Sequence, residues 1–161
     1  MSISCLPNKL IGKVQTTVSD LGKMAFELVK YSSEFQVAVV DLWRKCNLIV
    51  PQNDPVDDIH KKIEFQPDLF FIGLLGGQVV GSIMVGYEGH RGWINYLAVA
   101  PEYQKRGYGT KLVLKAIGEL KKLGCLKINL QVRRSNTSVV EFYNHLGFKE
   151  DDVLSLGMRL K

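Results

Sequence analysis

The hexapeptide QKRGYG, residues 104–109, places two glycines and two cations directly before a helical pattern. The first backbone N–H groups of a helix have no internal partner, and the helix dipole adds about half a positive charge at that end. Successive N–H groups in a tight loop form a concave anion site, and glycine lets a ligand approach without a Cβ in the way. Gly107 and Gly109 therefore predict a cradle for a phosphate group, with Lys105 and Arg106 as cations at its rim.

Two common phosphate-binding motifs are not met by this loop. The pattern GxxxxGK[ST] is absent, and Leu112 stands where GxGxxG needs its third glycine. The sequence therefore lacks the motifs that would indicate binding of a nucleoside triphosphate or a dinucleotide. What remains is QxxGxG, from Gln104 to Gly109, after an apolar segment that ends at Pro101.

The composition is that of one ordinary globular domain. The 161 residues are 46% hydrophobic and 23% charged, which argues against a disordered chain. A net charge of +5 suits an anionic partner, namely nucleic acid, an acidic membrane or a phosphorylated small molecule. Because the basic residues form no run of five or six, a nucleic-acid-binding tail is disfavoured.

The cysteines and the apolar segments indicate the cellular compartment in which the protein is expected. Cys5, Cys46 and Cys125 are odd in number and form no CxxC, so neither a disulfide framework nor a zinc site is expected. Reduced thiols and a cytoplasmic location fit better. No segment approaches the roughly 18 to 20 apolar residues of a membrane span, and no signal peptide is recognised. The prediction therefore includes neither a metal nor a membrane.

The elements that must position the glycine loop follow from the apolar pattern. Residues 1–24 are weakly patterned and are expected to form an extension, partly disordered, with a short strand near 14–18. The patterns then predict strands at 25–31, two within 68–87, and others at 93–100, 126–132 and 153–160. Helices are predicted after Ser32 or Ser33, after Asp54, from the glycine loop to Gly124, and from Ser135 or Asn136 to Leu146. This order predicts an α/β (α+β) domain with helices on both faces of one sheet.

Two separated segments resemble the GCN5-related N-acetyltransferase (GNAT) family. INYLAVAPEYQKRGYGTKLV, residues 94–113, resembles the family's cofactor motif of strand, [QR]xxGx[GA] loop and helix. NTSVVEFYNHLGF, residues 136–148, resembles its second motif, an Asn at a helix start followed by a Tyr and a terminal Gly-Phe. The resemblance covers residues 25–161 as a single N-acetyltransferase domain. It implies acetyl-CoA as cosubstrate and a mixed, mostly antiparallel sheet of six to seven strands, with two cofactor strands splayed apart.

The resemblance also implies which residues bind the cofactor. The pyrophosphate of CoA is expected on the backbone amides of Gln104, Lys105, Arg106, Gly107, Tyr108, Gly109 and Thr110. The pantetheine arm is expected to pair with the strand backbone at Leu97, Ala98 and Val99. Asn136 and Tyr143 are seven residues apart and share one helix face. The family places this Asn near the cofactor and this Tyr near its sulfur, although a plain N-cap and a core residue are the alternatives.

The general base is the least determined part of the predicted site. An alkylamine with a pKa near 10.4 is protonated at pH 7, so a base or a water chain must remove a proton. Many family members carry Glu or Asp about two residues before the position of Leu97, where this chain has Asn95. Glu88, if burial raises its pKa, and His90, by its intrinsic pKa, are the catalytic candidates. A solvated hairpin loop is the alternative for both.

The predicted function is acetyl transfer from acetyl-CoA to a primary amine by direct attack, with Tyr143 protonating the departing thiolate. The alternative is an acyl-CoA-binding sensor or scaffold without efficient catalysis, to which Asn95 gives weight. Nucleic-acid binding rests on net charge alone and is not predicted. The acceptor is not identified, and the expected acceptor groove contains Trp43, Asn53, Asp57, Glu88, His90 and Arg91. The alternating segment 153–160 can serve as the edge of a homodimer.

Overall fold

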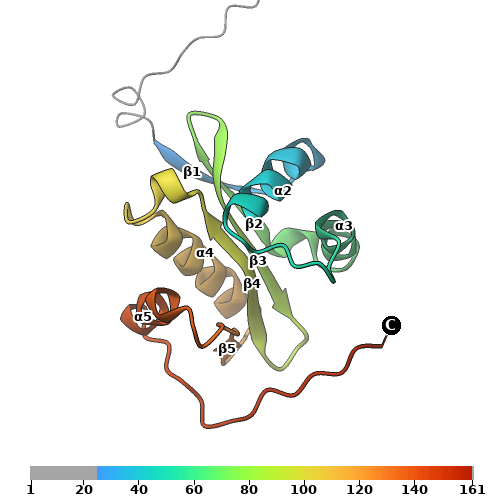
Figure 1. The fold of residues 1–161 in the computed structure, drawn as a ribbon, viewed down its shortest axis with the longest axis vertical. Helices are drawn as coiled ribbons and strands as arrows, with labels where there is room; N and C mark the ends of the chain where they lie inside the picture. The colour runs from blue at the N-terminus through green and yellow to red at the C-terminus, as the bar shows by residue number, and fades with distance from the viewer. Residues whose placement is uncertain (1–24, 161) are drawn as a thin grey trace, which may run out of the picture.

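Five strands form one sheet in the order β1-β2-β3-β4-β5 in the computed structural model, which describes residues 25–160 (Figure 1). Neighbours from β1 to β4 are antiparallel, and β4 and β5 are parallel. The expected short strand near residues 14–18 lies outside the described residues. The strands are β1 (Phe26–Lys30), β2 (Phe70–Leu75), β3 (Gln78–Tyr87), β4 (Gly92–Val99) and β5 (Ile128–Asn129).

The helices lie near their predicted positions, although α2 begins at Gln36 after a 3₁₀ turn and is capped by neither Ser32 nor Ser33. Asp54 caps α3, since its side chain accepts a hydrogen bond of 2.8 Å from the Val56 N–H and Pro55 occupies the first helical position. The α-helices are α2 (Gln36–Lys45), α3 (Pro55–Phe65), α4 (Tyr108–Lys122) and α5 (Thr137–His145). The 3₁₀ turns are η1 (Ser33–Phe35), η2 (Pro67–Leu69) and η3 (Pro101–Tyr103).

Both faces of the sheet are covered, as predicted. The helices α2 and α3 lie on one side of the sheet, while α4 and α5 lie on the other (Figure 1). Phe70 packs in the core cluster that contains Trp43 of α2, whereas its neighbour Phe71 packs in the cluster that contains Leu112 of α4. Because successive strand residues point to opposite faces, a strand that is apolar at both positions needs a helical layer on each side.

The prediction of a final strand at residues 153–160 is wrong. This segment follows an extended path away from α5 without entering the sheet, and its alternating apolar side chains are 83% to 90% exposed (Figure 1). Alternation favours a strand only where a neighbouring strand supplies backbone partners. β5 is only two residues long, shorter than the predicted 126–132, so the sheet has five strands and not six to seven. The exposed residues of the alternation are Leu154, Leu156, Met158 and Leu160.

Side chains, and not backbone pairs, hold the start of this segment beside β5. Lys127 forms an ion pair of 2.6 Å with Asp151, and the Gln131 amide donates to the Ser155 hydroxyl at 2.5 Å. The segment 153–160, which was expected to serve as the edge of a homodimer, is therefore not a formed strand.

Candidate active site

The strand β4 separates from β5 after their first two residues. The strands pair at Gly92 with Ile128 and at Trp93 with Asn129, and this register contains no further pair among the described residues. The other edge of β4 stays paired with β3. The segment 95–99 therefore has one edge without a strand partner, which we call the open edge of β4. The splayed cofactor strands implied by the family resemblance are present in the structure.

A β-bulge interrupts β4 at the start of this open edge. Ser82 pairs with Ala98 and Met84 with Asn95, so Tyr96 and Leu97 together lie opposite the single residue Ile83. Tyr96 has a φ of +48°, which is uncommon for a residue with a side chain. The bulge reverses the alternation of the strand: Ile94 and Leu97, three residues apart, both pack in the core cluster on the α4 side.

The glycine loop at the end of β4 has the backbone of an anion site. Gly107 caps α4 with a φ of +80°, and Lys105 has a φ of +59°. The first backbone hydrogen bond at the start of α4 runs from the Lys111 N–H to the Gly107 carbonyl at 3.1 Å. The N–H groups of residues 108–110 precede it and have no acceptor within the helix. This arrangement of free amides fits a phosphate group.

Side chains tie this loop to the strand before it. The Gln104 amide donates to the Val99 carbonyl at 2.9 Å, and the Arg106 guanidinium donates to the Glu102 carbonyl at 3.1 Å. At the other end of the loop, the Tyr108 ring stacks on Phe26 of β1 with ring centroids 4.3 Å apart. The predicted side chains of the loop thus stabilise its shape, while Gly107 leaves the backbone uncovered.

The helix α5 begins at the predicted position. Asn136 is the N-cap residue, although its side chain accepts from the Ser138 hydroxyl at 3.3 Å and not from the helix backbone. Tyr143 is 6% exposed and packs edge-on against Phe142 and Phe148. Burial raises the pKa of Tyr143 above the ordinary value of a phenol, so its hydroxyl stays protonated at neutral pH.

The loop before β4 contains Glu88 and His90, and both side chains are exposed. The Glu88 carboxylate accepts from the backbone N–H groups of His90 at 2.7 Å and of Arg91 at 2.8 Å. These bonds lower the pKa of Glu88. The expectation that burial raises this pKa is therefore wrong, and the solvated hairpin loop describes Glu88 better. From Gly92 to Leu97 the strand spans about 16 Å, so the loop lies well away from the bulge.

A hydrogen-bonded chain behind the bulge joins α2, α3, β3 and β4. The Trp43 indole donates to the Ser82 hydroxyl at 2.8 Å, and that hydroxyl donates to the Tyr96 carbonyl at 3.2 Å. The Tyr96 ring stacks on Trp43 with centroids 4.0 Å apart. Its hydroxyl donates to the Asp58 carboxylate at 2.5 Å. Burial, together with Asp58, raises the pKa of Tyr96 to about 12.

The sequence pattern did not single out Asp58 or Tyr96 as site residues and pointed to neighbouring residues instead. Trp43, expected in the acceptor groove, is fully buried under Tyr96. Asp57, also expected there, is exposed and forms an ion pair of 2.5 Å with Lys61. The position of Asp58 in the predicted helix offers one signal. Asp58 precedes the buried Ile59 and lies on the same helix face as Lys62.

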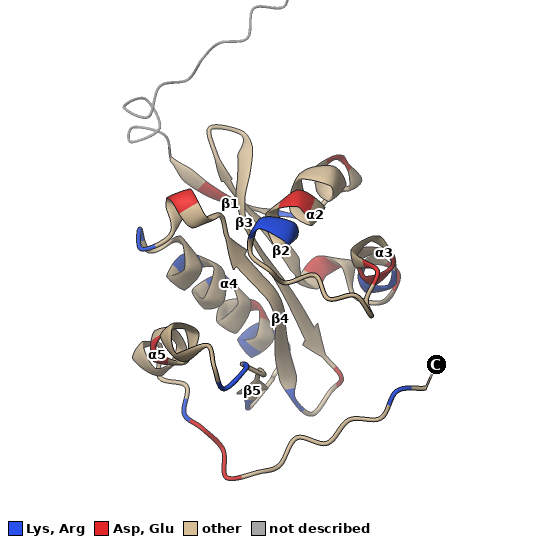
Figure 2. Ribbon diagram, in the orientation of Figure 1, with Lys and Arg blue, Asp and Glu red and all other residues tan. Residues whose placement is uncertain are grey.

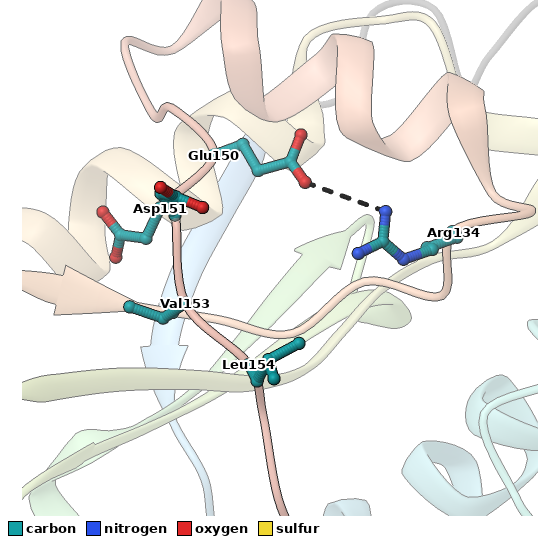
Figure 3. A pocket seen from close by; sticks show the side chains of 6 residues that line it. Arg134, Glu150, Asp151, Val153 and Leu154 are labelled. Carbon is teal, nitrogen blue, oxygen red and sulfur yellow. Dashed lines mark ion pairs between the residues drawn. The ribbon is translucent and has the colours of Figure 1, made fainter.

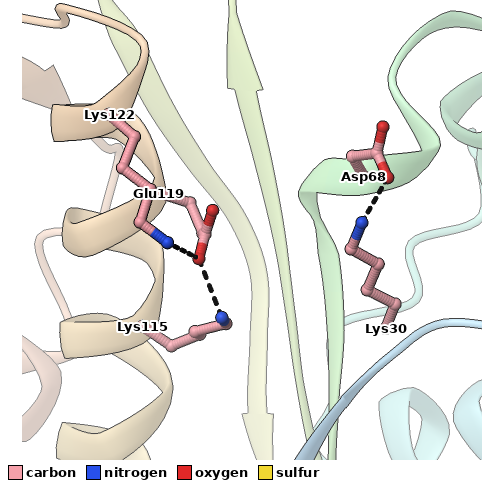
Figure 4. Close-up of polar contacts among 5 residues, drawn as sticks. All are labelled: Lys30, Asp68, Lys115, Glu119 and Lys122. Atoms are coloured by element: carbon pink, nitrogen blue, oxygen red, sulfur yellow. Dashed lines mark hydrogen bonds and ion pairs between the residues drawn. The ribbon is translucent and has the colours of Figure 1, made fainter.

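Charged residues elsewhere are distributed over many elements (Figure 2). On α4, Glu119 accepts from Lys115 at 2.8 Å and from Lys122 at 2.9 Å, and these bonds lower the pKa of Glu119 to about 2 (Figure 4). Lys30 of β1 pairs with Asp68 at 2.5 Å (Figure 4). These are ion pairs along a helix surface and between neighbouring elements, and they stabilise the fold only modestly.

A cavity of about 430 Å³ lies beside α5 and the C-terminal segment (Figure 3). Its walls are Arg134 and residues 150–154, and Arg134 faces Glu150 at 4.0 Å (Figure 3). Both side chains are more than 80% exposed. None of the predicted site residues lines this cavity.

Metal ligands and membrane-spanning helices were sought among residues 25–160. In this part of the chain, no group of three or more His, Cys, Asp or Glu side chains is placed to hold a metal ion. None of its helices has the length and apolar character required to cross a membrane.

Known proteins match the chain in sequence. The model of the "Acetyltransferase (GNAT) family" matches residues 37–148. The acetyltransferase SG1711 of Sodalis glossinidius is 46% identical over 123 residues, which cover 76% of this chain and 87% of that protein. The acetyltransferase ECA0875 of Pectobacterium atrosepticum is 42% identical over 123 residues, with the same coverage.

Solved structures match the fold. The PaiA N-acetyltransferase of Thermoplasma acidophilum, in complex with coenzyme A, has a TM-score of 0.65 at 21% identity, over 81% of this chain and 93% of that one. The aminoglycoside N-acetyltransferase AAC(6')-Iy, in complex with CoA, has a TM-score of 0.71 at 15% identity, over 86% and 97%. With the glycine loop, the splayed strands and the sequence relatives on one chain, this protein belongs to the GNAT family of acetyltransferases.

Proposed function

We propose that this acetyltransferase moves the acetyl group of acetyl-CoA to the nitrogen of a primary amine by direct attack. The observation that carries the proposal is the continuity of the open edge of β4 with the free amides of the glycine loop. A linear thioester with a pyrophosphate at one end is the kind of ligand that an unpaired strand edge and a helix N-terminus bind together. Two structural neighbours, at low identity, were solved with CoA.

The cofactor-binding residues follow the loop and the strand. The amides of residues 104–110 would hold the pyrophosphate, with Lys105 and Arg106 as screened cations at the rim. The backbone of Leu97, Ala98 and Val99 would pair with the pantetheine arm. Residues of the second motif, Asn136 and Tyr143, would close the site from α5. The left-handed backbone at Gly107 and Lys105, which turns the amides to one side, supports this fit.

The reaction needs few groups from the protein. The amine lone pair attacks the thioester carbonyl carbon, a C–N bond forms, and the C–S bond breaks to release a thiolate. The Tyr143 hydroxyl would donate its hydrogen to the departing sulfur. Because burial raises the pKa of Tyr143 while an ordinary thiol has a pKa near 8.5, a hydrogen bond in the transition state is favoured over full proton transfer.

The proton lost by the amine needs an acceptor. Glu88 is disfavoured, since three backbone hydrogen bonds occupy its carboxylate and lower its pKa. His90, at the same end of β4, stays the candidate base and would have to act through a chain of water molecules. The exposed Asn95 has no acidic function, so the alternative of an acyl-CoA-binding sensor keeps one specific observation in its favour.

Two further proposals concern the setting of the enzyme. The free thiols of Cys46 and Cys125 suit a reducing cytoplasm. The exposed apolar residues of segment 153–160 suit a homodimer that pairs this segment with a second copy. Light scattering on the native chain and on the variant Leu156→Asp would test the dimer, which predicts dissociation by the aspartate.

Binding and turnover together test the proposed function. CoA and acetyl-CoA should raise the melting temperature of the native protein, and ATP and NAD at equal concentration should raise it much less. A panel of primary amines should then release free thiol from acetyl-CoA. Stabilisation by CoA without thiol release from any amine supports the sensor, while no stabilisation by saturating CoA excludes both functions.

A further inference from the structure

A carboxylate from α3 contacts the far end of the Tyr96 side chain, which leaves β4 at the bulge. The bulge directs the Tyr96 side chain to the α2–α3 face of the sheet, where it packs in the cluster of Trp43. The next residue, Leu97, has its side chain in the cluster on the opposite face. Tyr96, whose hydroxyl contacts Asp58, is therefore adjacent in the chain to Leu97, whose backbone is proposed to pair with the pantetheine arm of acetyl-CoA.

The Asp58 carboxylate is partly exposed, and it accepts a hydrogen bond from the neutral hydroxyl of Tyr96. Among residues 25–160, Asp58 forms no ion pair with a Lys or Arg within 4.0 Å, whereas four other aspartates do. A carboxylate accepts about four hydrogen bonds, so the one from Tyr96 leaves capacity for a further donor. The aspartates with basic partners are Asp41 with Arg44, Asp57 with Lys61, Asp68 with Lys30 and Asp151 with Lys127.

The surroundings of Asp58 suit an alkylammonium ion. The Tyr96 ring is partly exposed and is held from behind by the fully buried Trp43. An aromatic ring beside a carboxylate attracts a cation and offers an apolar wall to its methylene groups. A chain with net charge +5 otherwise repels such a ligand, so a local carboxylate is needed to attract it.

We propose that Asp58, oriented by Tyr96, binds the cationic amine of the acceptor beside the open edge of β4, and that this pair selects alkylamines over uncharged acceptors. The inference rests on the proposed function and names the substrate class of the same site. Asp58 is the binding residue, and Tyr96 is a positioning residue that acts through it. A purely structural role, a clamp between α3 and β4, is the competing explanation.

The test compares two acceptors and two matched aspartates. Butylamine carries a positive charge at neutral pH, while hydroxylamine is uncharged there and also attacks thioesters. Asp58→Asn removes the charge and keeps the size of the side chain. Asp57→Asn removes the same charge from the adjacent, exposed position in the same first helical turn, so it controls for the helix dipole. Thiol release, corrected for the uncatalysed rate, and thermal stabilisation by CoA are measured on each protein.

We expect Asp58→Asn to raise KM for butylamine by about 10- to 100-fold, the usual weight of a hydrogen bond to a charged group. Its kcat, its KM for hydroxylamine and its stabilisation by CoA should stay within about twofold of the native values. Tyr96→Phe, which keeps the stack on Trp43, should raise KM for butylamine about three- to tenfold in the same selective way.

Equal increases of KM for both acceptors, or equal effects of Asp58→Asn and Asp57→Asn, would overturn the inference and leave the proposed function intact. Lowered melting temperatures with unchanged KM would establish the structural clamp instead. If the native protein binds CoA but transfers to neither acceptor nor to any amine of the panel, the proposed function fails, and the inference fails with it.

Discussion

A Cβ atom on Gly109 would lie 3.3 Å from the ring of Phe142, which places the glycine loop in direct contact with α5. Phe142 in turn packs against the ring of Tyr143, with centroids 5.1 Å apart. At Gly107, by contrast, a Cβ would meet nothing within 4 Å, and the positive φ alone explains the glycine. The two glycines of the loop therefore have different roles, one in packing and one in backbone conformation.

Gly109→Val should lower the melting temperature and weaken CoA binding by at least about tenfold. The added side chain collides with the Phe142 ring, and overpacking of this kind costs about 1–3 kcal/mol. The variant Phe142→Leu makes room for the new side chain, so the double variant should recover part of both losses. Thermal unfolding with and without CoA measures both effects. Strict additivity of the two single changes would show that the contact is unimportant.

Lys105→Ala should weaken CoA binding much less than Gly109→Val, by about two- to fivefold. Lys105 contributes an exposed charge at the rim, and salt screens such a charge within about 10 Å at 0.1 M. The difference from the native protein should therefore disappear when CoA titrations are repeated at about 1 M salt. A loss that persists at high salt would point to the backbone at Lys105, whose φ is +59°.

Tyr143→Phe should lower kcat by at least about tenfold and leave CoA affinity and melting temperature nearly unchanged. The ring and its contacts with Phe142 and Phe148 remain, while the proton donor is lost. A role confined to the transition state lowers kcat and kcat/KM together. If the hydroxyl has only a structural role, the variant should instead lose about 1 kcal/mol of stability with turnover intact. Steady-state kinetics and thermal melts on the same variant distinguish the two.

Lys62→Met should stabilise the protein at pH 7 and lose this advantage as the pH rises. Burial lowers the pKa of Lys62 to about 8, against about 10.4 in an unfolded chain. Between these values the unfolded chain binds more protons, so native stability increases with pH from about 8 to 10.4. Below pH 8 the ammonium stays charged in the folded state at an energetic cost.

Because Lys62 is only half buried, we expect a gain of about 1–2 kcal/mol for Lys62→Met at pH 7. Urea unfolding of both proteins at pH 7, 8.5 and 10 measures the difference. Lys62 also donates to the Val85 carbonyl, and the neutral donor variant Lys62→Gln controls for loss of that bond. A difference that does not change with pH would contradict the assigned direction of the pKa.

The sequence predicted those parts of the candidate site that depend on residues close together in the chain. The glycine loop, the capping of α3 by Asp54 and the start of α5 at Asn136 depend on residues a few positions apart, and all three lie where the sequence predicted them. The same holds for the apolar runs of β2 and β3, whose side chains cover both faces of the sheet.

Features that depend on distant partners were missed. The segment WINYLAVA predicts a regular strand, and nothing in it signals that Tyr96 adopts a positive φ opposite Ile83. Asp58 and Tyr96 are 38 residues apart, so their hydrogen bond needs the packing of α3 on the sheet. The alternation of residues 153–160 signalled a strand, but the two-residue β5 offers it little to pair with.

The bulge in β4 divides two tasks between adjacent residues. Tyr96 directs its side chain to the α2–α3 face, and Leu97 directs its side chain to the α4 face at the open edge. Because strand alternation has a period of two, Ile94 and Leu97 face the same side only because the bulge inserts one extra residue between them. A variant that lacks Tyr96 would therefore regain the regular alternation and keep Leu97 on the α4 face, but it would lose the ring whose hydroxyl contacts Asp58.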